Sequence, residues 1–235
     1  RDPKIWEKNG NYYAVIGGET EDKCGKVVYY RSRDLQEYTY CGVFADSDGS
    51  IGNMWECPNF VQIGNTDVLI ISPKGLEKEN GFSASFESGY MTGKMNYEEG
   101  MFSHASYKKL DHGFDFYAPQ AFYGKDKQPM MFAWLGCGAQ ELPYAKEDMW
   151  IHSLTMPRFL TIKEGKLCQE VPENIKNEYV HLDIDSKRIK PEEDTWYINL
   201  TDKQISEIQI GDQEDHLSIK IDWAAGHIVA DRSTL

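Results

Sequence analysis

Three acidic residues of the chain recur in similar surroundings, each shortly before a proline and a strand-like run. Asp2 stands directly before a proline, Glu56 two residues before one, and Asp111 eight residues before one. Glu is a poor strand former, and an acidic side chain is costly to bury without a partner. The acids therefore call for a chemical reason. Two carboxyl groups that share one site are the usual catalysts of glycosidic bond cleavage.

Such a site needs one carboxyl group that carries a proton near neutral pH, although a free Glu titrates near pH ~4.3. Glu56 lies between Trp55 and Cys57, which are expected to exclude water from it, and a nearby Asp2 would disfavour its ionised form. We therefore expect Glu56 to be the proton donor. Asp2 is expected to stay ionised. Arg1 offers it a positive charge, but adjacent side chains of a strand point to opposite faces, so another residue could be its partner.

The elements that would position these residues form a repeat. Three segments each consist of a proline, a strand-like run, a polar turn and a second run, and the prolines Pro3, Pro58 and Pro119 are spaced 55 and 61 residues apart. Proline is tolerated at the first residue of a strand. Short strands that repeat at this spacing predict a β-propeller with about four antiparallel strands in each blade. Corresponding residues of successive first strands would then converge at the central channel.

The second part of the chain has a different pattern of apolar and polar residues. From residue 161 short runs alternate apolar and polar residues, which is typical of antiparallel sheets with one buried face. The predicted architecture is all-β, with propeller blades at residues 1–160 and a truncated β-sandwich at residues 161–235. The strands expected in the sandwich are residues 167–171, 179–184, 195–200, 205–210 and 216–221, with a linker or short helix at 173–178.

Composition excludes several classes of function. The net charge of −13 argues against a nucleic acid partner, because a phosphate backbone requires a positive surface. No apolar run approaches the roughly 18 residues of a membrane helix. The five cysteines form no C-x-x-C pair or Cys/His cluster, and the chain lacks G-x-S-x-G, H-E-x-x-H and a complete dinucleotide loop. We therefore expect no metal and no organic cofactor.

The chain resembles the invertase-like β-fructofuranosidases of glycoside hydrolase family 32. Four motifs carry the likeness in the family's order, and a fifth matches the close of the family's propeller. Together they extend over most of the chain. The motifs are Arg1-Asp2-Pro3, Glu56-Cys57-Pro58, Asp111-His112-Gly113-Phe114-Asp115-Phe116-Tyr117-Ala118-Pro119-Gln120, Trp134-Leu135-Gly136 and Met156-Pro157-Arg158.

The resemblance implies a five-bladed β-propeller followed by a β-sandwich, with the active site in the funnel of the propeller. It gives Asp2 the role of transition-state stabiliser and Glu56 the role of general acid and base. Arg1, Asp111 and Trp134 match positions that line the fructose site. From the residues themselves, Asp111 could instead cap the turn that follows it, and Trp134 could fill the core between blades. Arg158 is expected to make an ion pair at the domain junction.

One departure from the family concerns the nucleophile. The family's nucleophile is the Asp of an Asn-Asp-Pro motif on its first blade, and this sequence contains no Asn-Asp-Pro. About three blades are accounted for. We therefore expect an internal piece of the family fold that is inactive alone, whose partner is the pair of N-terminal blades, in a separate chain or another segment.

The expected function is hydrolysis, with retention, of terminal β-fructofuranosides. Sucrose, sucrose 6-phosphate and fructans such as inulin and levan are not separated by these residues, and we expect a cytoplasmic location from the bacterial form of the motifs. The alternative is a non-catalytic propeller that binds sugar through the same acids. A five-bladed arabinan or xylan hydrolase shares the architecture but fits Glu56-Cys57-Pro58 less well.

Overall fold

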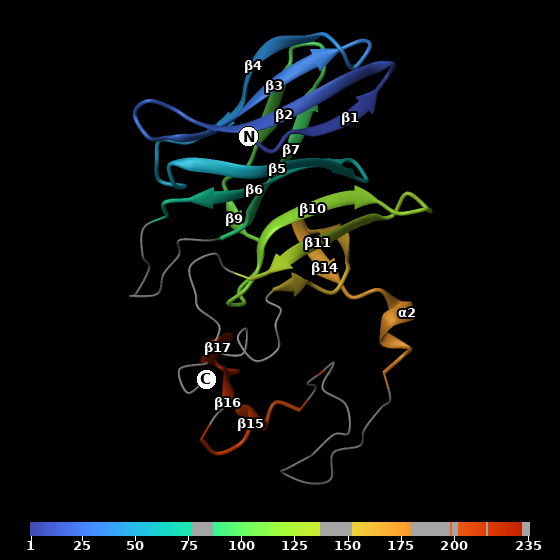
Figure 1. Ribbon diagram of the computed structural model, residues 1–235. Helices are drawn as coiled ribbons and strands as arrows, with labels where there is room; N and C mark the ends of the chain where they lie inside the picture. Colours follow the sequence, from blue (N-terminus) through green and yellow to red (C-terminus); the bar gives the residue numbers. More distant parts are fainter. Residues whose placement is uncertain (77–86, 137–151, 180–197, 199–201, 215, 232–235) are drawn as a thin grey trace. The chain divides into compact units, whose positions relative to one another are not determined.

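The computed structural model describes residues 1–76, 87–136, 152–179, 198, 202–214 and 216–231 (Figure 1). The chain divides into two compact units, Arg1–Pro172 and Glu173–Leu235. Nearly all of the regular structure is β-strand. Among the described residues no helix has the length and apolar character needed to cross a membrane.

The first unit contains three antiparallel sheets that follow one another along the chain (Figure 1). The first sheet is β1 (Lys4–Lys8), β2 (Asn11–Glu19), β3 (Gly25–Ser32) and β4 (Tyr38–Asp46). The second is β5 (Met54–Ile63), β6 (Thr66–Lys74), β7 (Gly89–Asn96) and β8 (Met101–His104), with β9 (Lys108–Lys109) beside β7. The third is β10 (Tyr117–Tyr123), β11 (Pro129–Leu135), β13 (Arg158–Lys163) and β14 (Lys166–Glu170), with β12 (Ser153–Leu154) beside β11. Each is a blade of the predicted propeller.

The second blade is buried on both faces. Successive side chains of a strand point to opposite sides of the sheet. In β6, Leu69 and Ile71 belong to the core shared with the first blade, whereas Val68 and Ile70 belong to the core shared with the third. All four side chains are fully buried. This explains why β6 is continuously apolar in sequence instead of alternating.

Specific contacts hold the blades in register. Trp55 is fully buried, and its indole lies over Gly25, where an added Cβ would come within 2.2 Å of the ring. Between the second and third blades, the buried Asn59 side chain donates to the carbonyl of Pro119 at 2.8 Å and accepts from the N–H of Ala121 at 3.0 Å. Buried polar groups need such partners, so Asn59 fixes β5 against β10.

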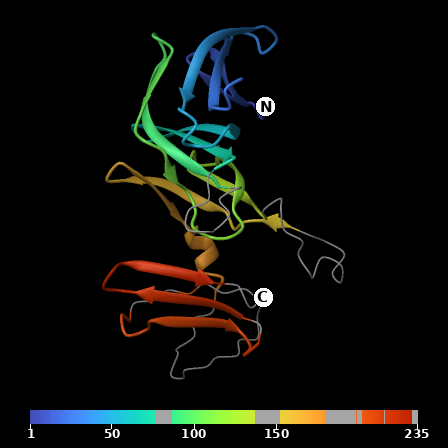
Figure 2. The same cartoon turned by 90° about the vertical axis from the view of Figure 1, so that its left-hand side faces the viewer.

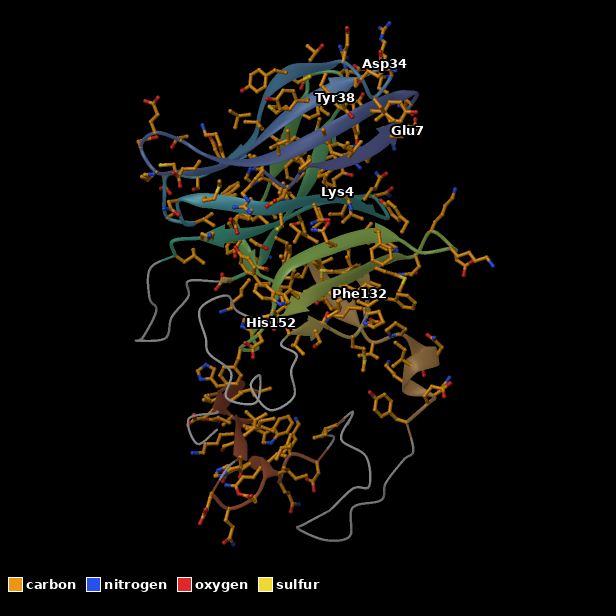
Figure 3. All side chains as sticks on the ribbon, in the orientation of Figure 1. Lys4, Glu7, Asp34, Tyr38, Phe132 and His152 are labelled. Atoms are coloured by element: carbon orange, nitrogen blue, oxygen red, sulfur yellow. The ribbon has the colours of Figure 1, made fainter. Side chains whose placement is uncertain are left out.

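Lys4 links the first blade directly to the third. Its ammonium group donates to the carbonyl oxygen of Ala121 at 2.5 Å, across 117 residues of sequence. Lys4 is labelled in Figure 3. Lys4, Asn59 and Gln120 each directly follow one of the three repeated prolines. Pro3 directly precedes β1, but Pro58 and Pro119 lie inside β5 and β10 and not at the start of the strand, where they were expected. The innermost strands β1, β5 and β10 therefore converge, as the repeat predicts.

The end of the first unit differs from the expectation. The strand at residues 167–171, assigned above to the sandwich, belongs instead to the third blade, where β14 pairs with β13 from Phe159↔Glu170 to Lys163↔Lys166. The first unit extends to Pro172. Outer strands of a blade and strands of a sandwich share the period of two, so the pattern alone could not separate them.

The described residues of the second unit form one short helix and one sheet. The helix α2 (Glu173–Lys176) falls within the predicted linker or helix. The sheet has the order β15 (Glu207–Gly211), β16 (His216–Asp222) and β17 (His227–Asp231), as Figure 2 shows. Strands were expected at β15 and β16 but not at β17. The strands expected at 179–184 and 195–200 lie, apart from residues 179 and 198, outside the described residues.

Candidate active site

The residue before each of the three prolines has a left-handed backbone. The φ angles are +57° at Asp2, +49° at Cys57 and +49° at Ala118. Positive φ is uncommon for residues other than glycine. Its recurrence at one place in three blades identifies it as a feature of the fold rather than a local irregularity.

In the second and third blades the same turn shifts the pairing of the innermost strand by one residue. Between Glu56 and Asn59, three steps along β5 correspond to two along β6, from Ser72 to Ile70. The third blade repeats the shift between β10 and β11 at Tyr117. Bulges of this kind redirect side chains and are frequent beside active sites.

The shift places three side chains together. The residues two positions before the prolines are Arg1, Glu56 and Tyr117, one from each blade. The Arg1 guanidinium lies 2.9 Å from Oε1 of Glu56, and the Tyr117 hydroxyl donates to Oε2 of Glu56 at 2.8 Å. Corresponding positions thus converge on one carboxyl group.

Glu56 is the centre of this cluster. It is 6% exposed, and the exposed ammonium group of Lys74 lies 3.5 Å from its Oε1. A buried carboxyl group is tolerated only with such partners. One carboxyl oxygen therefore faces two cations at the rim, and the other faces a buried tyrosine.

Asp2 lies beside Glu56 and is bound by its neighbours. Its Oδ2 accepts from the backbone N–H of Cys57 at 3.0 Å and lies 3.3 Å from Nε of Arg1. Partial burial alone would raise the pKa of Asp2, but the hydrogen bonds from Cys57 and the charge of Arg1 outweigh it, so the pKa lies below its ordinary value. Asp2 is thus held as a carboxylate. Arg1 itself is a partner, because the left-handed backbone of Asp2 breaks the alternation of the strand.

Cys57 adjoins both acids but is not an activated thiol. Its Sγ lies 3.5 Å from Oδ2 of Asp2. Burial, followed by the charge of Asp2, raises the pKa of the Cys57 thiol to about 12. The thiolate is the nucleophilic form of cysteine, so this thiol does not supply a nucleophile at neutral pH.

Asp111 belongs to a different cluster. Its Oδ2 lies 2.6 Å from Nη1 of Arg158, and its Oδ1 accepts from the N–H of Gly113 at 2.7 Å. Arg158 also lies over the ring of Phe116 and donates to Gln169. Within the described part of the chain no hydrogen bond or ion pair joins Asp111 to Glu56 or Asp2. The ion pair expected of Arg158 is present, and it lies inside the first unit.

Trp134 approaches the site through Tyr117. The two residues are paired across β10 and β11, and their rings meet edge to face with centroids 6.5 Å apart. The half-buried indole also packs against His152 at 4.6 Å (Figure 3). Trp134 thus forms one wall beside the Glu56 cluster.

Two residues of the cluster were missed in the sequence. Asp111 is the third-blade acid that the sequence pattern groups with Glu56, whereas Tyr117 occupies the corresponding position in the structure. Counting two residues back from each proline would have found Tyr117. Lys74 ends β6, and no motif marked it. Among the described residues no cluster of His, Cys, Asp and Glu is arranged to hold a metal ion.

Comparison with known proteins places the chain in a family. The model of the glycosyl hydrolases family 32 N-terminal domain matches residues 1–171. The chain belongs to glycoside hydrolase family 32. Its first unit therefore consists of blades of the family's five-bladed β-propeller, and the predicted all-β fold is confirmed.

Individual members of family 32 agree. The sucrose-6-phosphate hydrolase of Bacillus subtilis is 38% identical over 177 residues, which cover 72% of this chain and 37% of that relative. A Bombyx mori GH32 β-fructofuranosidase has a TM-score of 0.71 at 32% identity, over 77% of this chain and 39% of that one. A fructofuranosidase of Schwanniomyces occidentalis shares the fold over 99% of this chain and 52% of its own, at 20% identity and a TM-score of 0.69. The chain spans less than two fifths of the length of the curated relative from B. subtilis.

Proposed function

We propose that the full-length product of this gene is a retaining β-fructofuranosidase. The observation that carries the proposal is the meeting of Arg1, Asp2 and Glu56 from two blades, with Glu56 buried, ion-paired through Oε1 and hydrogen bonded through Oε2. Retaining glycosidases use one carboxyl group as acid and then as base. Family 32 membership and the names of the relatives support this reaction class.

In this mechanism Glu56 protonates the oxygen of the leaving sugar and later takes a proton from water. Asp2 stays ionised, and its free lone pairs accept hydrogen bonds from hydroxyl groups of the fructose ring. Such bonds strengthen as positive charge develops at the anomeric carbon. Arg1 and Trp134 would line the same sugar. For Asp111 we propose a supporting role, because Arg158 and Gly113 already engage its carboxylate.

The nucleophile has to come from elsewhere in the propeller. Retention requires a second carboxyl group about 5–5.5 Å from the acid, and this sequence contains no Asn-Asp-Pro. We propose that blades preceding Arg1 in the fold supply it, from the same polypeptide or a second one. Asp2 remains the stabiliser in this scheme.

For the substrate we propose sucrose 6-phosphate or sucrose. A phosphorylated sugar calls for a basic group near the site, and Lys74 is an exposed ammonium group 3.5 Å from Glu56. The B. subtilis and Staphylococcus xylosus relatives are named sucrose-6-phosphate hydrolases. A cytoplasmic location, where phosphorylated sugars occur, belongs to the same proposal.

The test is fructose release by the full-length product from sucrose and from sucrose 6-phosphate. Glu56→Gln should lower kcat by about 10³-fold, within the range typical of a lost general acid and base. Glu87→Gln is the matched control, because Glu87 is also largely buried and pairs with a tyrosine and a lysine. It should leave kcat within a few fold of the unmodified enzyme. Fructose binding without turnover would instead identify a sugar-binding propeller.

A further inference from the structure

The Tyr117 hydroxyl has two acceptors but only one proton. It donates to Oε2 of Glu56 at 2.8 Å, and the backbone carbonyl of Ser72 lies 3.3 Å from the same oxygen. A phenol can donate one hydrogen bond at a time, although its oxygen can also accept one. The hydroxyl can therefore turn between the carboxylate and the carbonyl without leaving its place.

A residue that is acid in one step and base in the next exists in two protonation states. An ionised Glu56 is an acceptor and needs donors, whereas a protonated Glu56 is itself a donor. Since Glu56 and Tyr117 are both buried, either state would be costly if it left a polar group without a partner. A fixed donor would suit only one of the two states.

We propose that Tyr117 is a positioning residue that keeps Glu56 hydrogen bonded in both of its protonation states; this inference rests on the proposed function. When Glu56 is ionised, Tyr117 donates to Oε2. When Glu56 carries its proton on Oε2, that proton bonds to the Tyr117 oxygen, and Tyr117 donates to the Ser72 carbonyl. During cleavage the hydrogen bond between this proton and the Tyr117 oxygen breaks, the proton passes from Oε2 of Glu56 to the leaving oxygen, and the Tyr117 hydroxyl turns back to donate to Oε2. Tyr117 keeps its own proton throughout.

The groups around the pair agree with this role. Burial, followed by the hydrogen bond to Glu56, raises the pKa of the Tyr117 hydroxyl, so it remains a donor. Arg1 and Lys74 pair with Oε1 of Glu56, and Asp2 pairs with Arg1. Oε2 is thus the carboxyl oxygen left to Tyr117.

The chain supplies a matched control in a second triad of the same types. The Tyr107 hydroxyl donates to Oε1 of Glu87 at 2.9 Å, and Lys109 lies 3.0 Å from Oε2 of Glu87. Tyr107→Phe and Tyr117→Phe remove the same atom from equally short bonds to a carboxylate. Only Tyr117→Phe touches Glu56.

The decisive measurement is a carbon-13 NMR titration of the full-length product. The Glu56 carboxyl signal is assigned by its loss in Glu56→Gln. Tyr117→Phe should move the pH midpoint of this signal upward by about one unit, because the hydrogen bond that the ionised form loses is charge-assisted and stronger than the one that the protonated form loses. Tyr107→Phe should leave the midpoint in place. An unmoved midpoint in Tyr117→Phe, or equal movement in both variants, would overturn the proposal.

The turning of the hydroxyl has its own signal in the unmodified protein. Ser72 precedes Pro73, the single Ser-Pro pair of residues 1–235, so carbonyl-labelled serine with nitrogen-labelled proline marks its carbonyl, and the loss of this signal in Ser72→Ala assigns it in the full-length product. That signal should move as Glu56 titrates and lose this response in Tyr117→Phe. If the Ser72 carbonyl signal of the unmodified protein does not move as Glu56 titrates, the proposed turning of the hydroxyl is contradicted. This result would hold even if no variant folds.

Kinetics separate this proposal from the proposed function. In an active enzyme, Tyr117→Phe should lower kcat by about 10- to 100-fold, the effect of one hydrogen bond to a charged group. The apparent pKa of the alkaline limb of the kcat pH profile should move to higher pH together with the NMR midpoint. Tyr107→Phe should leave this apparent pKa unchanged. Absence of fructose release in the unmodified product would refute the fructofuranosidase, whereas the two NMR titrations would still decide the role of Tyr117.

Discussion

The contacts of the Asp2 carboxylate depend on the φ angle of Asp2. With φ at +57°, Asp2 departs from the alternation of a strand, so that its side chain meets both its neighbour Arg1 and the backbone of Cys57. An extended backbone would have separated Arg1 from Asp2. Strain of this kind persists where surrounding contacts over-determine it, and here the contacts come from two blades.

Asp2 should make the stability of the protein depend on pH in acid. Its pKa in the folded state lies below the ordinary value, so its contribution is complete above about pH 4 and is lost as the pH falls through the folded pKa. Asp2→Asn should therefore lower the free energy of unfolding at pH 7, by about 1 kcal/mol for a partly exposed group. The difference from the unmodified protein should shrink toward pH 3.

Urea unfolding at pH 7 and pH 3 measures this difference. Asp126→Asn, in an exposed turn, serves as the control and should change stability little at either pH. A deficit in Asp2→Asn that is equally large at both pH values would show that the carboxylate is not the source of the stability.

The three X-Pro turns explain how strands far apart in sequence build one site. The turns of the second and third blades add a residue to the innermost strand. The side chain before each of the three turns lies in the cluster where Arg1, Glu56 and Tyr117 meet. The proline spacing predicted the blades and the convergence of Asp2 with Glu56. It did not predict Tyr117, because Tyr117 is not acidic and only its position two residues before a proline marks it. Asp111 pairs with Arg158 instead.

The packing of the first blade on the second depends on glycine at residue 25. A Cβ there would lie 2.2 Å from the indole of Trp55, and Trp55 is fully enclosed. Gly25→Ala should therefore destabilise the protein by about 1–3 kcal/mol through overpacking. Thermal unfolding measures the loss. Gly18→Ala is the control, because its Cβ would meet no atom closer than 3.9 Å, and equal effects of the two substitutions would contradict the steric explanation.

At the scale of the whole chain, the sequence predicts the fold class but not the exact end of the last blade. The circular order of the blades follows from repeats that each carry a proline, a turn and two strands, so the fold class could be predicted. The end of the last blade could not, because β14 has the same alternation as a sandwich strand. The place of Lys74 beside Glu56 could not be predicted from the sequence either, because it depends on how β6 pairs with β5.

The catalytic set should be complete only when this chain is combined with an Asn-Asp-Pro segment. Residues 1–235 alone are expected to release no fructose from sucrose, because Glu56 would have no nucleophile to work with. Joining the part of the B. subtilis relative that precedes its match to Arg1 should restore hydrolysis, since the two chains are 38% identical over the matched region. Glu56→Gln in that chimera should abolish the recovery. Fructose release by the isolated chain, or a chimera indifferent to Glu56→Gln, would show that the carboxyl groups gathered here are not the ones that cleave the sugar.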